Sequence, residues 1–223
     1  APGIPTILHG LMLCGPYLIP NVHEDVYGVY TNTTPVEAYR GAGRPEATFM
    51  LERMIDVLAH KIGVDAAEVR RRNLIPPFEN GHDVVTGLKY DSGNYQGALD
   101  KALTHVGYES LRREQAAARA KGRYLGIGVS TYVEICGLGP SQVAGAIGFQ
   151  GGLWESAIVR VHPSGKVNVF IGASPHGQGE ETTFAQVVAD ELGFGVDDIK
   201  IVHGDTDNTP MGWGTYGSRT TAV

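Results

Sequence analysis

The chain has 223 residues, of which 42% are hydrophobic and 19% are charged, and its formal net charge is −6. This apolar content is enough to bury a core, and it excludes a disordered or fibrous protein. Because 24 acidic residues outnumber 18 basic ones, no overall field attracts nucleic acid or an anionic membrane.

The cysteines indicate a cellular compartment, and the chain ends suggest that the sequence is part of a longer protein. Cys14 and Cys136 have neither metal-ligand nor redox spacing, which suits a reducing compartment, and we expect both to be small buried side chains. No apolar run is long enough to span a bilayer and no signal peptide is present, so we expect a cytoplasmic protein. Residues 1–5 lack an initiating Met, and residues 219–223 carry no helix cap. Both features suggest a piece of a longer chain.

The first predicted elements are a strand and a loop that opens a helix. Branched and aromatic residues predict a strand over 22–30, followed by a turn at 32–35. Residues 38–47 then form a glycine-rich loop with two arginines that runs directly into a helix. Pro45 fits the first helical position, where its missing N–H costs nothing. Free backbone N–H groups at a helix start favour anions, so this loop is a candidate anion site.

Two helices follow this loop. Apolar residues at spacings of three and four predict one buried helix face, which ends at Gly63. They are Ala47, Met50, Leu51, Met54, Ile55, Leu58 and Ile62. Asp65 and Glu68 match a capping box for a second helix. Residues 70–72 are three arginines in its last turn, where positive charge is favourable, and this explanation ranks above nucleic-acid binding.

The second half of the chain alternates helical and strand patterns. Residues 77–94 are polar and without period, which predicts a linker between two units. Helical patterns follow at 95–103 and 110–120, and a strand-like stretch covers 126–135.

The last third of the chain predicts a hairpin, a helix and a strand. Alternating residues at 157–161 and 167–171 flank a Pro-Ser-Gly turn and predict the hairpin. The glycines at 177–179 open a helix whose apolar face contains Phe184, Val187, Val188 and Leu192, and a short strand covers 199–202. The mixture of elements predicts an α+β fold.

Three glycine loops share one physical design. Residues 38–47, 176–182 and 214–219 all place bare backbone N–H groups and a few polar side chains at or near helix starts. Together they would suit a large anionic ligand. Each loop alone is also consistent with an ordinary start of a helix.

Other motifs point away from several chemistries. Residues 212–217 match the letters of the dinucleotide fingerprint but follow a turn and not a strand, so a Rossmann site is rejected. No phosphate-binding Gly-Lys-Ser/Thr loop and no serine nucleophile elbow occur, and the histidines lack metal-ligand spacing, so no protein-ligated metal is expected. Asp205 and Asp207 are expected to cap a turn. Glu134 is either a buried, functional carboxylate or an exposed residue on an edge strand.

The ordered motifs together carry a resemblance. Residues 39–44, 130–134, 177–182, 204–207 and 214–219 resemble the molybdenum-binding large subunit of the xanthine dehydrogenase, aldehyde oxidase and aerobic carbon monoxide dehydrogenase family. The resemblance covers nearly the whole chain. It implies parts of two mixed α/β molybdenum-cofactor-binding domains. Residues 1–76 would be the C-terminal part of the first domain, and residues 95–223 would be the N-terminal part of the second.

The resemblance also implies a cofactor and site residues. The cofactor would be molybdopterin, as its cytosine dinucleotide, with molybdenum held by the cofactor's own dithiolene sulfurs. An active-site loop beside the substrate would contain Arg40, Gly41 and Ala42. The implied cofactor-binding residues are Gly177, Gln178, Gly179, Thr215, Gly217 and Ser218.

The implied reaction is hydroxylation of carbon with oxygen derived from water. Electrons would pass to [2Fe-2S] clusters and FAD on an iron–sulfur small subunit and a flavin-binding medium subunit, in a dimer of heterotrimers. The family's catalytic glutamate lies downstream of these motifs and is absent from this sequence, so the chain alone is predicted to be inactive.

The sequence departs from the family pattern at three positions, two of which bear on the substrate. Gly41 stands where copper-containing carbon monoxide dehydrogenases have a cysteine, and Ala42 stands where xanthine oxidases have an aromatic residue. An aldehyde or N-heterocycle is therefore the expected substrate. A carbon monoxide dehydrogenase-like (form II) enzyme and a non-catalytic binding module are the alternatives. Glu180 replaces a histidine that is common in relatives, and its effect is not predicted.

Overall fold

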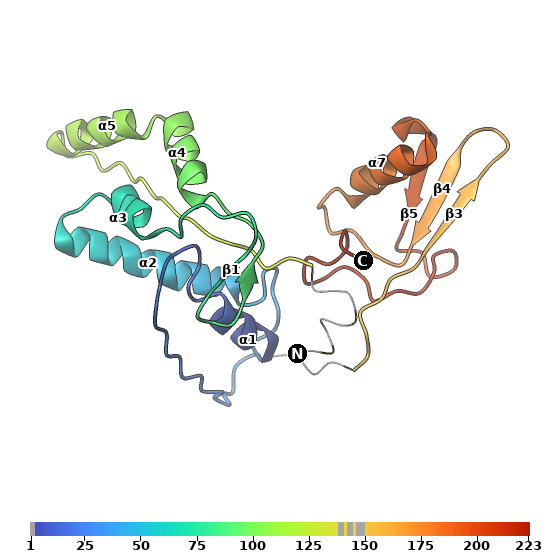
Figure 1. Cartoon of the computed structure of the whole chain (residues 1–223), viewed down its shortest axis with the longest axis horizontal. Helices are drawn as coiled ribbons and strands as arrows, with labels where there is room; N and C mark the ends of the chain where they lie inside the picture. The colour runs from blue at the N-terminus through green and yellow to red at the C-terminus, as the bar shows by residue number, and fades with distance from the viewer. Residues whose placement is uncertain (1–2, 138–140, 142–144, 146–149) are drawn as a thin grey trace. The chain divides into compact units, whose positions relative to one another are not determined.

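The computed structural model describes residues 3–137, 141, 145 and 150–223, which fall into two compact units (Figure 1). Unit 1 is Ala1–Glu134 and unit 2 is Ile135–Val223. Unit 1 is mostly helical, whereas unit 2 contains a three-stranded sheet. This mixture confirms the predicted α+β class. No helix in the described part of the chain is long and apolar enough to cross a membrane.

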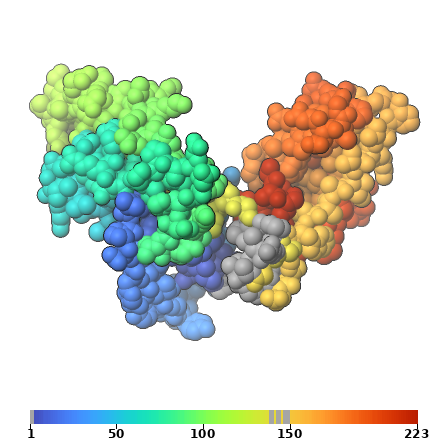
Figure 2. Space-filling model, in the orientation of Figure 1, coloured from blue at the N-terminus to red at the C-terminus, as the bar shows by residue number. Residues whose placement is uncertain are grey.

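Unit 1 contains five helices and a short hairpin among its described residues. They are α1 (Gly3–Leu11), α2 (Arg44–Ile62), α3 (Ala66–Asn73), β1 (His82–Asp83), β2 (Lys89–Tyr90), α4 (Tyr95–Val106) and α5 (Tyr108–Ala120). The predicted helices are confirmed, and α4 and α5 extend slightly beyond their predicted ends. Figure 2 shows the light green residues of α4 and α5 lying against the teal residues of α3.

Helix α2 begins and ends as predicted but buries only part of the predicted face. Gly43 and Gly63 flank it in the left-handed conformation, which glycine adopts without penalty. Ala47 and Ala59 are buried. The predicted buried residues Met50, Met54, Leu58 and Ile62 are instead 41–60% exposed. The prediction was right for Ala47, which is buried, and for Leu51 and Ile55, which pack against the core cluster. It was wrong for the other four residues, because the rest of the inner surface of α2 packs through small residues and a polar network.

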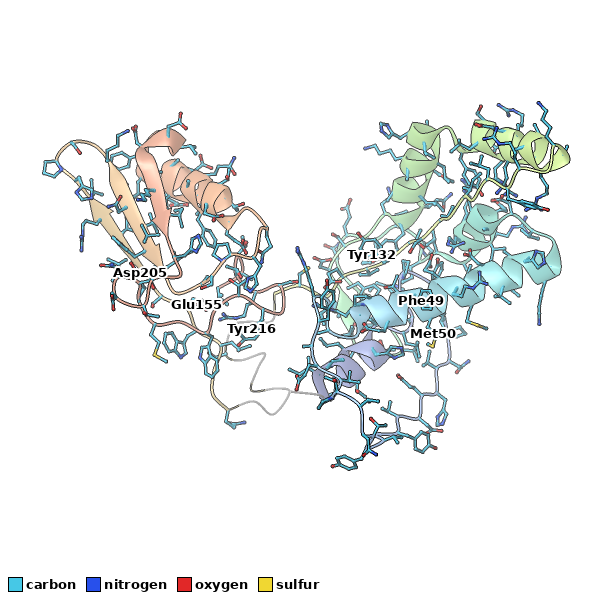
Figure 3. The ribbon with its side chains drawn as sticks, turned by 180° about the vertical axis from the view of Figure 1, so that it is seen from behind. Phe49, Met50, Tyr132, Glu155, Asp205 and Tyr216 are labelled. Carbon is cyan, nitrogen blue, oxygen red and sulfur yellow. The ribbon has the colours of Figure 1, made fainter. Side chains whose placement is uncertain are left out.

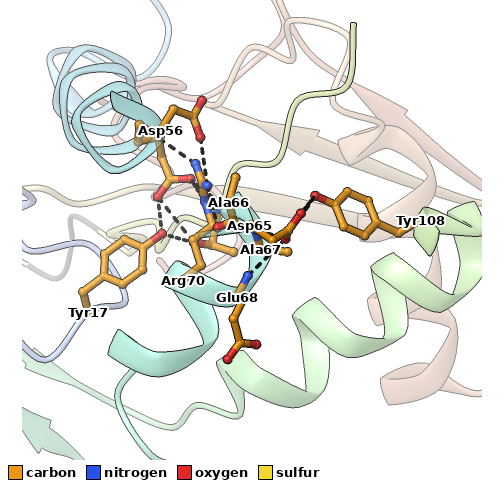
Figure 4. A network of polar contacts seen from close by, with 10 residues as sticks. Tyr17, Asp56, Asp65, Ala66, Ala67, Glu68, Arg70 and Tyr108 are labelled. Atoms are coloured by element: carbon orange, nitrogen blue, oxygen red, sulfur yellow. Dashed lines mark hydrogen bonds and ion pairs between the residues drawn. The ribbon is translucent and has the colours of Figure 1, made fainter. Parts of the chain in front are cut away.

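That polar network joins helices α2 and α3 to the segments that contain Tyr17 and Thr131 (Figure 4). Arg70 of α3 is fully buried, and its Nε donates to Glu52 Oε2 of α2 at 2.8 Å. Arg70 Nη1 also lies 2.9 Å from Asp56 Oδ1. Tyr17 donates its hydroxyl to Glu52, and Glu52 Oε2 accepts the Thr131 N–H at 2.8 Å. Ion pairing therefore explains Arg70 more directly than its position near a helix end does.

The start of α3 confirms its predicted cap. The Asp65 carboxylate accepts hydrogen bonds from the N–H groups of Ala67, at 2.9 Å, and Glu68, at 3.3 Å. Asp65 also accepts from the Tyr108 hydroxyl at 3.0 Å, which ties α3 to α5. A single carboxylate thus caps one helix and anchors another.

Two predicted strands of unit 1 do not form. Residues 22–30 and 126–135 are extended but belong to no strand ladder among the described residues. Residues 125–137 do alternate between exposed and partly buried, as a strand would. The predictions were wrong because this alternation reflects side-chain burial, whereas a strand also needs a neighbouring backbone to pair with.

The segment predicted as a linker, 77–94, packs within unit 1. Phe78 and Gly93 exchange two backbone hydrogen bonds of 2.9 Å, and the buried Tyr90 donates its hydroxyl to Gly15 O at 2.8 Å. The boundary between the compact units lies at residues 134 and 135. The assignment of 1–76 and 95–223 to two separate domains stays a prediction. Cys14 is buried as expected, but Cys136 is exposed, so that expectation was wrong.

In the described part of unit 2, helix α7 packs on a three-stranded sheet. Its elements are β3 (Ala157–Val161), β4 (Val167–Ile171), α7 (Glu180–Leu192), η1 (Val196–Asp198) and β5 (Ile199–Val202). The predicted hairpin, helix and final strand are all confirmed, but Val187 and Leu192 of the predicted apolar helix face are each 49% exposed, so that part of the prediction was wrong. The order is β3-β4-β5, with β3 antiparallel and β5 parallel to the central β4.

The core of unit 2 lies on one face of β4. Val167, Val169 and Ile171 alternate as buried residues, and Phe184 and Val188 of α7 pack against them. Figure 2 shows the orange-red residues of α7 lying against the light orange strands. Every residue of β3 is exposed, so this strand packs through its pairing with β4.

Candidate cofactor-binding site

The sheet register of unit 2 brings three segments to one end of the sheet. Because β4 and β5 are parallel, the loops that follow them, 172–179 and 203–219, leave the same end. Strand β3 begins there too, since Ala157 pairs with Ile171 at the end of β4. In Figure 3 Glu155, Asp205 and Tyr216 lie in these segments. Ligands of open sheets that contain parallel strands commonly bind beyond such carboxyl ends.

A hydrogen bond links the segment just before the predicted 176–182 loop to the predicted 214–219 loop. Ser174 N donates to Thr215 Oγ1 at 3.0 Å, which fastens the loop after β4 to the loop after β5. Gln178 lies just beyond, exposed, and its side-chain oxygen accepts the His176 N–H. The structure therefore places Thr215 beside the segment that leads into the 177–179 glycine loop, and their common cofactor site stays a prediction.

The glycines of these loops have open surroundings. Gly177, Gly179 and Gly214 have φ of 91°, 90° and 81°. A Cβ at any of the three would meet no atom within 4 Å. Backbone conformation, and not crowding, therefore requires glycine there. The Gly214 N–H is used within the protein, since it donates to Glu155, whereas the space beside Gly177 and Gly179 is open.

A buried ion pair supports the second loop. Glu155 Oε1 accepts from Gly214 N and from Arg219 Nη1, both at 2.6 Å. Arg219 is fully buried, and it also donates to Gly214 O at 2.8 Å and to Trp154 O at 3.3 Å. Sequence reasoning missed Glu155. An isolated glutamate before a strand gave no signal, although the arginine of the 214–219 motif was visible.

Two glycines make room for the Glu155 carboxylate. A Cβ on Gly212 would lie 1.8 Å from Glu155 Oε2, and one on Gly172 would lie 2.8 Å from it. Real Cβ atoms do not approach this closely, so both positions require glycine for space. The loops after β4 and β5 thus pack around one carboxylate.

Three buried polar atoms of unit 2 have no hydrogen-bond partner among the described residues. They are Glu155 Oε2, Glu180 Oε2 and Arg219 Nε. Glu180 is 6% exposed and lies at the first position of α7. Orphaned buried polar atoms are rare in folded proteins, and each needs an explanation, of which a bound group is one. Molybdopterin fits this set chemically, because its phosphates accept from guanidinium N–H groups and its pterin N–H groups donate to carboxylates.

The predicted active-site loop belongs to unit 1 and is tightly packed. Arg44 is 4% exposed, and its Nε donates to Gly41 O at 2.7 Å. A Cβ on Gly43 would lie 1.8 Å from Pro5 O, and Ala42 has a left-handed φ of 48°. Arg44 therefore supports the turn from inside. Arg40 is exposed, whereas Gly41 and Ala42 are partly buried.

Glu134 matches neither of its two predicted environments. Its side chain is 37% exposed, lies outside any strand, and pairs with Arg44 Nη1 at 2.7 Å. Partial burial raises the pKa of the Glu134 carboxyl, and the positive charge of Arg44 opposes this increase. Glu134 thus stabilises the turn before α2 through its ion pair with Arg44.

Asp205 accepts hydrogen bonds within its own turn, as predicted. Its carboxylate accepts from Asn208 Nδ2 at 2.7 Å and from Asp207 N at 3.0 Å. The hydrogen bond from the Asn208 side chain, followed by that from Asp207 N, lowers the pKa of Asp205. Within the described residues, no three His, Cys, Asp or Glu side chains gather into a metal-ligating group.

Comparison with known proteins decides the family. A family model described as a molybdopterin cofactor-binding domain matches residues 101–223, and a second model with the same description matches residues 1–74. The chain belongs to the molybdopterin cofactor-binding family. This finding confirms the resemblance that the ordered motifs carry.

Relatives in this family include enzymes with several substrates. The chain is 44% identical over 214 residues to the carbon monoxide dehydrogenase large chain of Hydrogenophaga pseudoflava, covering 94% of this chain and 26% of the relative. It is 37% identical to the gamma subunit of the 6-hydroxypseudooxynicotine dehydrogenase complex of Paenarthrobacter nicotinovorans, covering 94% of this chain and 25% of the relative. The chain thus spans about a quarter of the length of these family members.

A solved family member has a similar structure. Quinoline 2-oxidoreductase from Pseudomonas putida 86 matches with a TM-score of 0.85 and 36% sequence identity. The match covers 97% of this chain and 27% of that protein.

Proposed function

We propose that the chain is part of a molybdenum hydroxylase large subunit and that its unit 2 loops bind molybdopterin as the cytosine dinucleotide. The observation that supports this proposal is the Ser174–Thr215 hydrogen bond, which links the segment before the 177–179 motif to the 214–219 motif at the carboxyl ends of β4 and β5. Membership of the molybdopterin cofactor-binding family supports it.

The chain's own residues would bind and orient the cofactor. The space beside Gly177 and Gly179 is open, so their backbone N–H groups would bind an anionic group, and Gln178 supplies an exposed amide beside them. Thr215, Gly217 and Ser218 lie in the partner loop and would bind pterin or phosphate. When bound, the cofactor supplies the redox chemistry, and the protein contributes position and electrostatics.

We propose further that the intact enzyme oxidises an aldehyde or N-heterocycle with oxygen derived from water. Electrons would pass to [2Fe-2S] and FAD centres on partner subunits, in a cytoplasmic dimer of heterotrimers. Arg40, Gly41 and Ala42 would form the loop beside the substrate. The name of quinoline 2-oxidoreductase supports a heterocyclic substrate by analogy. The catalytic glutamate is outside this sequence, so the chain alone would be inactive.

A second candidate is a carbon monoxide dehydrogenase-like (form II) enzyme. The 44% identity to a carbon monoxide dehydrogenase large chain favours it. Against a copper-dependent mechanism, Gly41 offers no thiolate after Arg40. A non-catalytic binding module is the third possibility. The metal analysis described next distinguishes it from the two enzymes.

The test is purification of the full-length subunit with its partner subunits, followed by metal analysis and assay of released cytidine monophosphate. We expect molybdenum and cytidine monophosphate in stoichiometric amounts. Absence of molybdenum from well-folded complex would overturn the proposal and favour a binding module. Reduction of an artificial electron acceptor by aldehydes, N-heterocycles or carbon monoxide then separates the substrates, and labelled water identifies the oxygen source.

A further inference from the structure

Glu155 holds both ends of the 214–219 loop at a single carboxylate oxygen. Oε1 accepts from the N–H of Gly214, the first residue of the loop, and from the guanidinium of Arg219, the last. Arg219 Nη1 donates in turn to Gly214 O, which closes the ring. The four residues between these ends include Thr215, Gly217 and Ser218, the proposed cofactor contacts.

The loop has an unfavourable backbone that needs such support. Gly217 and Ser218 both have positive φ, 61° and 53°. For Ser218 this conformation costs free energy, which persists only where the surroundings enforce it. Gly137 N donates to Ser218 O at 2.8 Å, and the Arg219 guanidinium stacks over the Tyr216 ring at 5.4 Å. The loop is therefore held by its surroundings and not by local preference.

The ion pair between Glu155 and Arg219 is buried, so the loss of either charge would be costly. The Glu155 side chain is 10% exposed and that of Arg219 is 0% exposed. Removing one charge of a buried pair leaves the other uncompensated, which is far more costly than loss of an exposed pair. The Glu155 and Arg219 charges therefore depend on each other, and the loop depends on both.

We propose that Glu155 is a positioning residue that fixes the 214–219 loop in its cofactor-binding conformation through Gly214 and Arg219. The proposal deepens the proposed function and rests on it for the identity of the ligand. Glu155 itself need not touch the cofactor. Its effect is to place the Thr215 and Ser218 groups and the loop N–H groups before the ligand arrives.

The experiment compares Glu155→Gln with Val169→Ala in the full-length complex. Glu155→Gln keeps the size of the side chain and one acceptor but removes the charge opposite Arg219. Val169 is buried in β4, 3% exposed, so its truncation destabilises unit 2 without touching the loop. Gly212→Ala is the second variant, because its Cβ would displace Glu155 Oε2. This variant decides the result should Glu155→Gln fail to assemble.

Two readouts are needed. Amide hydrogen exchange of residues 213–218 reports the loop itself, and we expect about tenfold faster exchange in Glu155→Gln and Gly212→Ala than in Val169→Ala. Molybdenum per subunit reports cofactor retention, and we expect about tenfold faster loss on dialysis from the same two variants. Melting temperatures of all variants show how much of each change follows from overall stability.

The outcomes separate the two proposals. Unchanged loop exchange in Glu155→Gln and Gly212→Ala overturns the positioning role, whatever the metal content. The positioning role is also overturned if Val169→Ala changes loop exchange and molybdenum retention as much as Glu155→Gln and Gly212→Ala do. Glu155 would then act only through the overall stability of unit 2. A wild-type complex without molybdenum instead overturns the proposed function, and loop exchange still decides the positioning role.

Discussion

Helices α2 and α7 begin in the same way but in different surroundings. Each follows a glycine in the left-handed conformation, Gly43 with φ 94° and Gly179 with φ 90°, and neither has a side-chain N-cap hydrogen bond. In unit 1 the turn is filled by the protein itself, because Arg44 folds inward and Gly43 touches Pro5. In unit 2 the turn is open around Gly177 and Gly179. One local signature therefore serves packing in one unit and leaves backbone accessible in the other.

The largest expected effect is a loss of stability of unit 1 when its buried polar network is broken. Arg70→Ala leaves Glu52 buried without its cation, and we expect a loss of about 3–5 kcal/mol in the free energy of unfolding of unit 1. Arg72→Ala is the matched control. Its side chain is 63% exposed and pairs with Glu68 on the surface, so its removal should cost about 0.5 kcal/mol.

The two units can be followed separately in this experiment. Both tryptophans, Trp154 and Trp213, lie in unit 2, so their fluorescence reports that unit. Circular dichroism at the helix band is dominated by unit 1, which contains most of the helices. Urea unfolding should show Arg70→Ala shifting the dichroism midpoint and leaving the fluorescence midpoint in place. Equal midpoints for the two arginine variants would contradict the role of the buried network.

The next effect compares the two glycine turns directly. Gly43→Ala and Gly177→Ala both force alanine into a left-handed conformation, which costs about 1–2 kcal/mol. Only Gly43→Ala also drives a Cβ against a backbone carbonyl. We expect the free energy of unfolding to fall clearly more for Gly43→Ala than for Gly177→Ala, measured with the probe of the respective unit. A larger loss for Gly177→Ala would show that the unit 2 turn is not open.

The smallest effect is a pH dependence confined to unit 1. Burial, followed by the hydrogen bond to Asp65, raises the pKa of Tyr108 from 10.0 to about 12. The folded state thus favours the protonated hydroxyl, so stability is fully present below pH 10 and declines between about pH 10 and 12.

The test is Tyr108→Phe, which removes the ionisable group. The variant is expected to be less stable at neutral pH, because the hydrogen bond to Asp65 is lost, but to lose less stability on going to high pH. Dichroism midpoints between about pH 9 and 12 measure this difference. A parallel decline in wild type and variant would rule out a contribution from Tyr108.

Local signals predicted a large share of the fold. The glycine at each end of α2, the Asp65 cap of α3 and the hairpin of β3 and β4 were all readable, because each depends on a few neighbouring residues. Residues 22–30 and 126–135 were misread as strands for the opposite reason. Their composition favours extension, but pairing depends on a second segment that composition does not specify.

The same distinction between local signals and tertiary contacts applies to the candidate site. The sequence by itself determined the family, through ordered motifs of glycines with polar neighbours, and it determined where the chain turns. The tertiary structure alone decided that Arg44 points inward, that the loops after β4 and β5 are joined by Ser174 and Thr215, and that Glu155 supports one of them. The physical reason is that turns follow from nearby backbone preferences, whereas burial of a charge and its partner depends on segments brought together by sheet register.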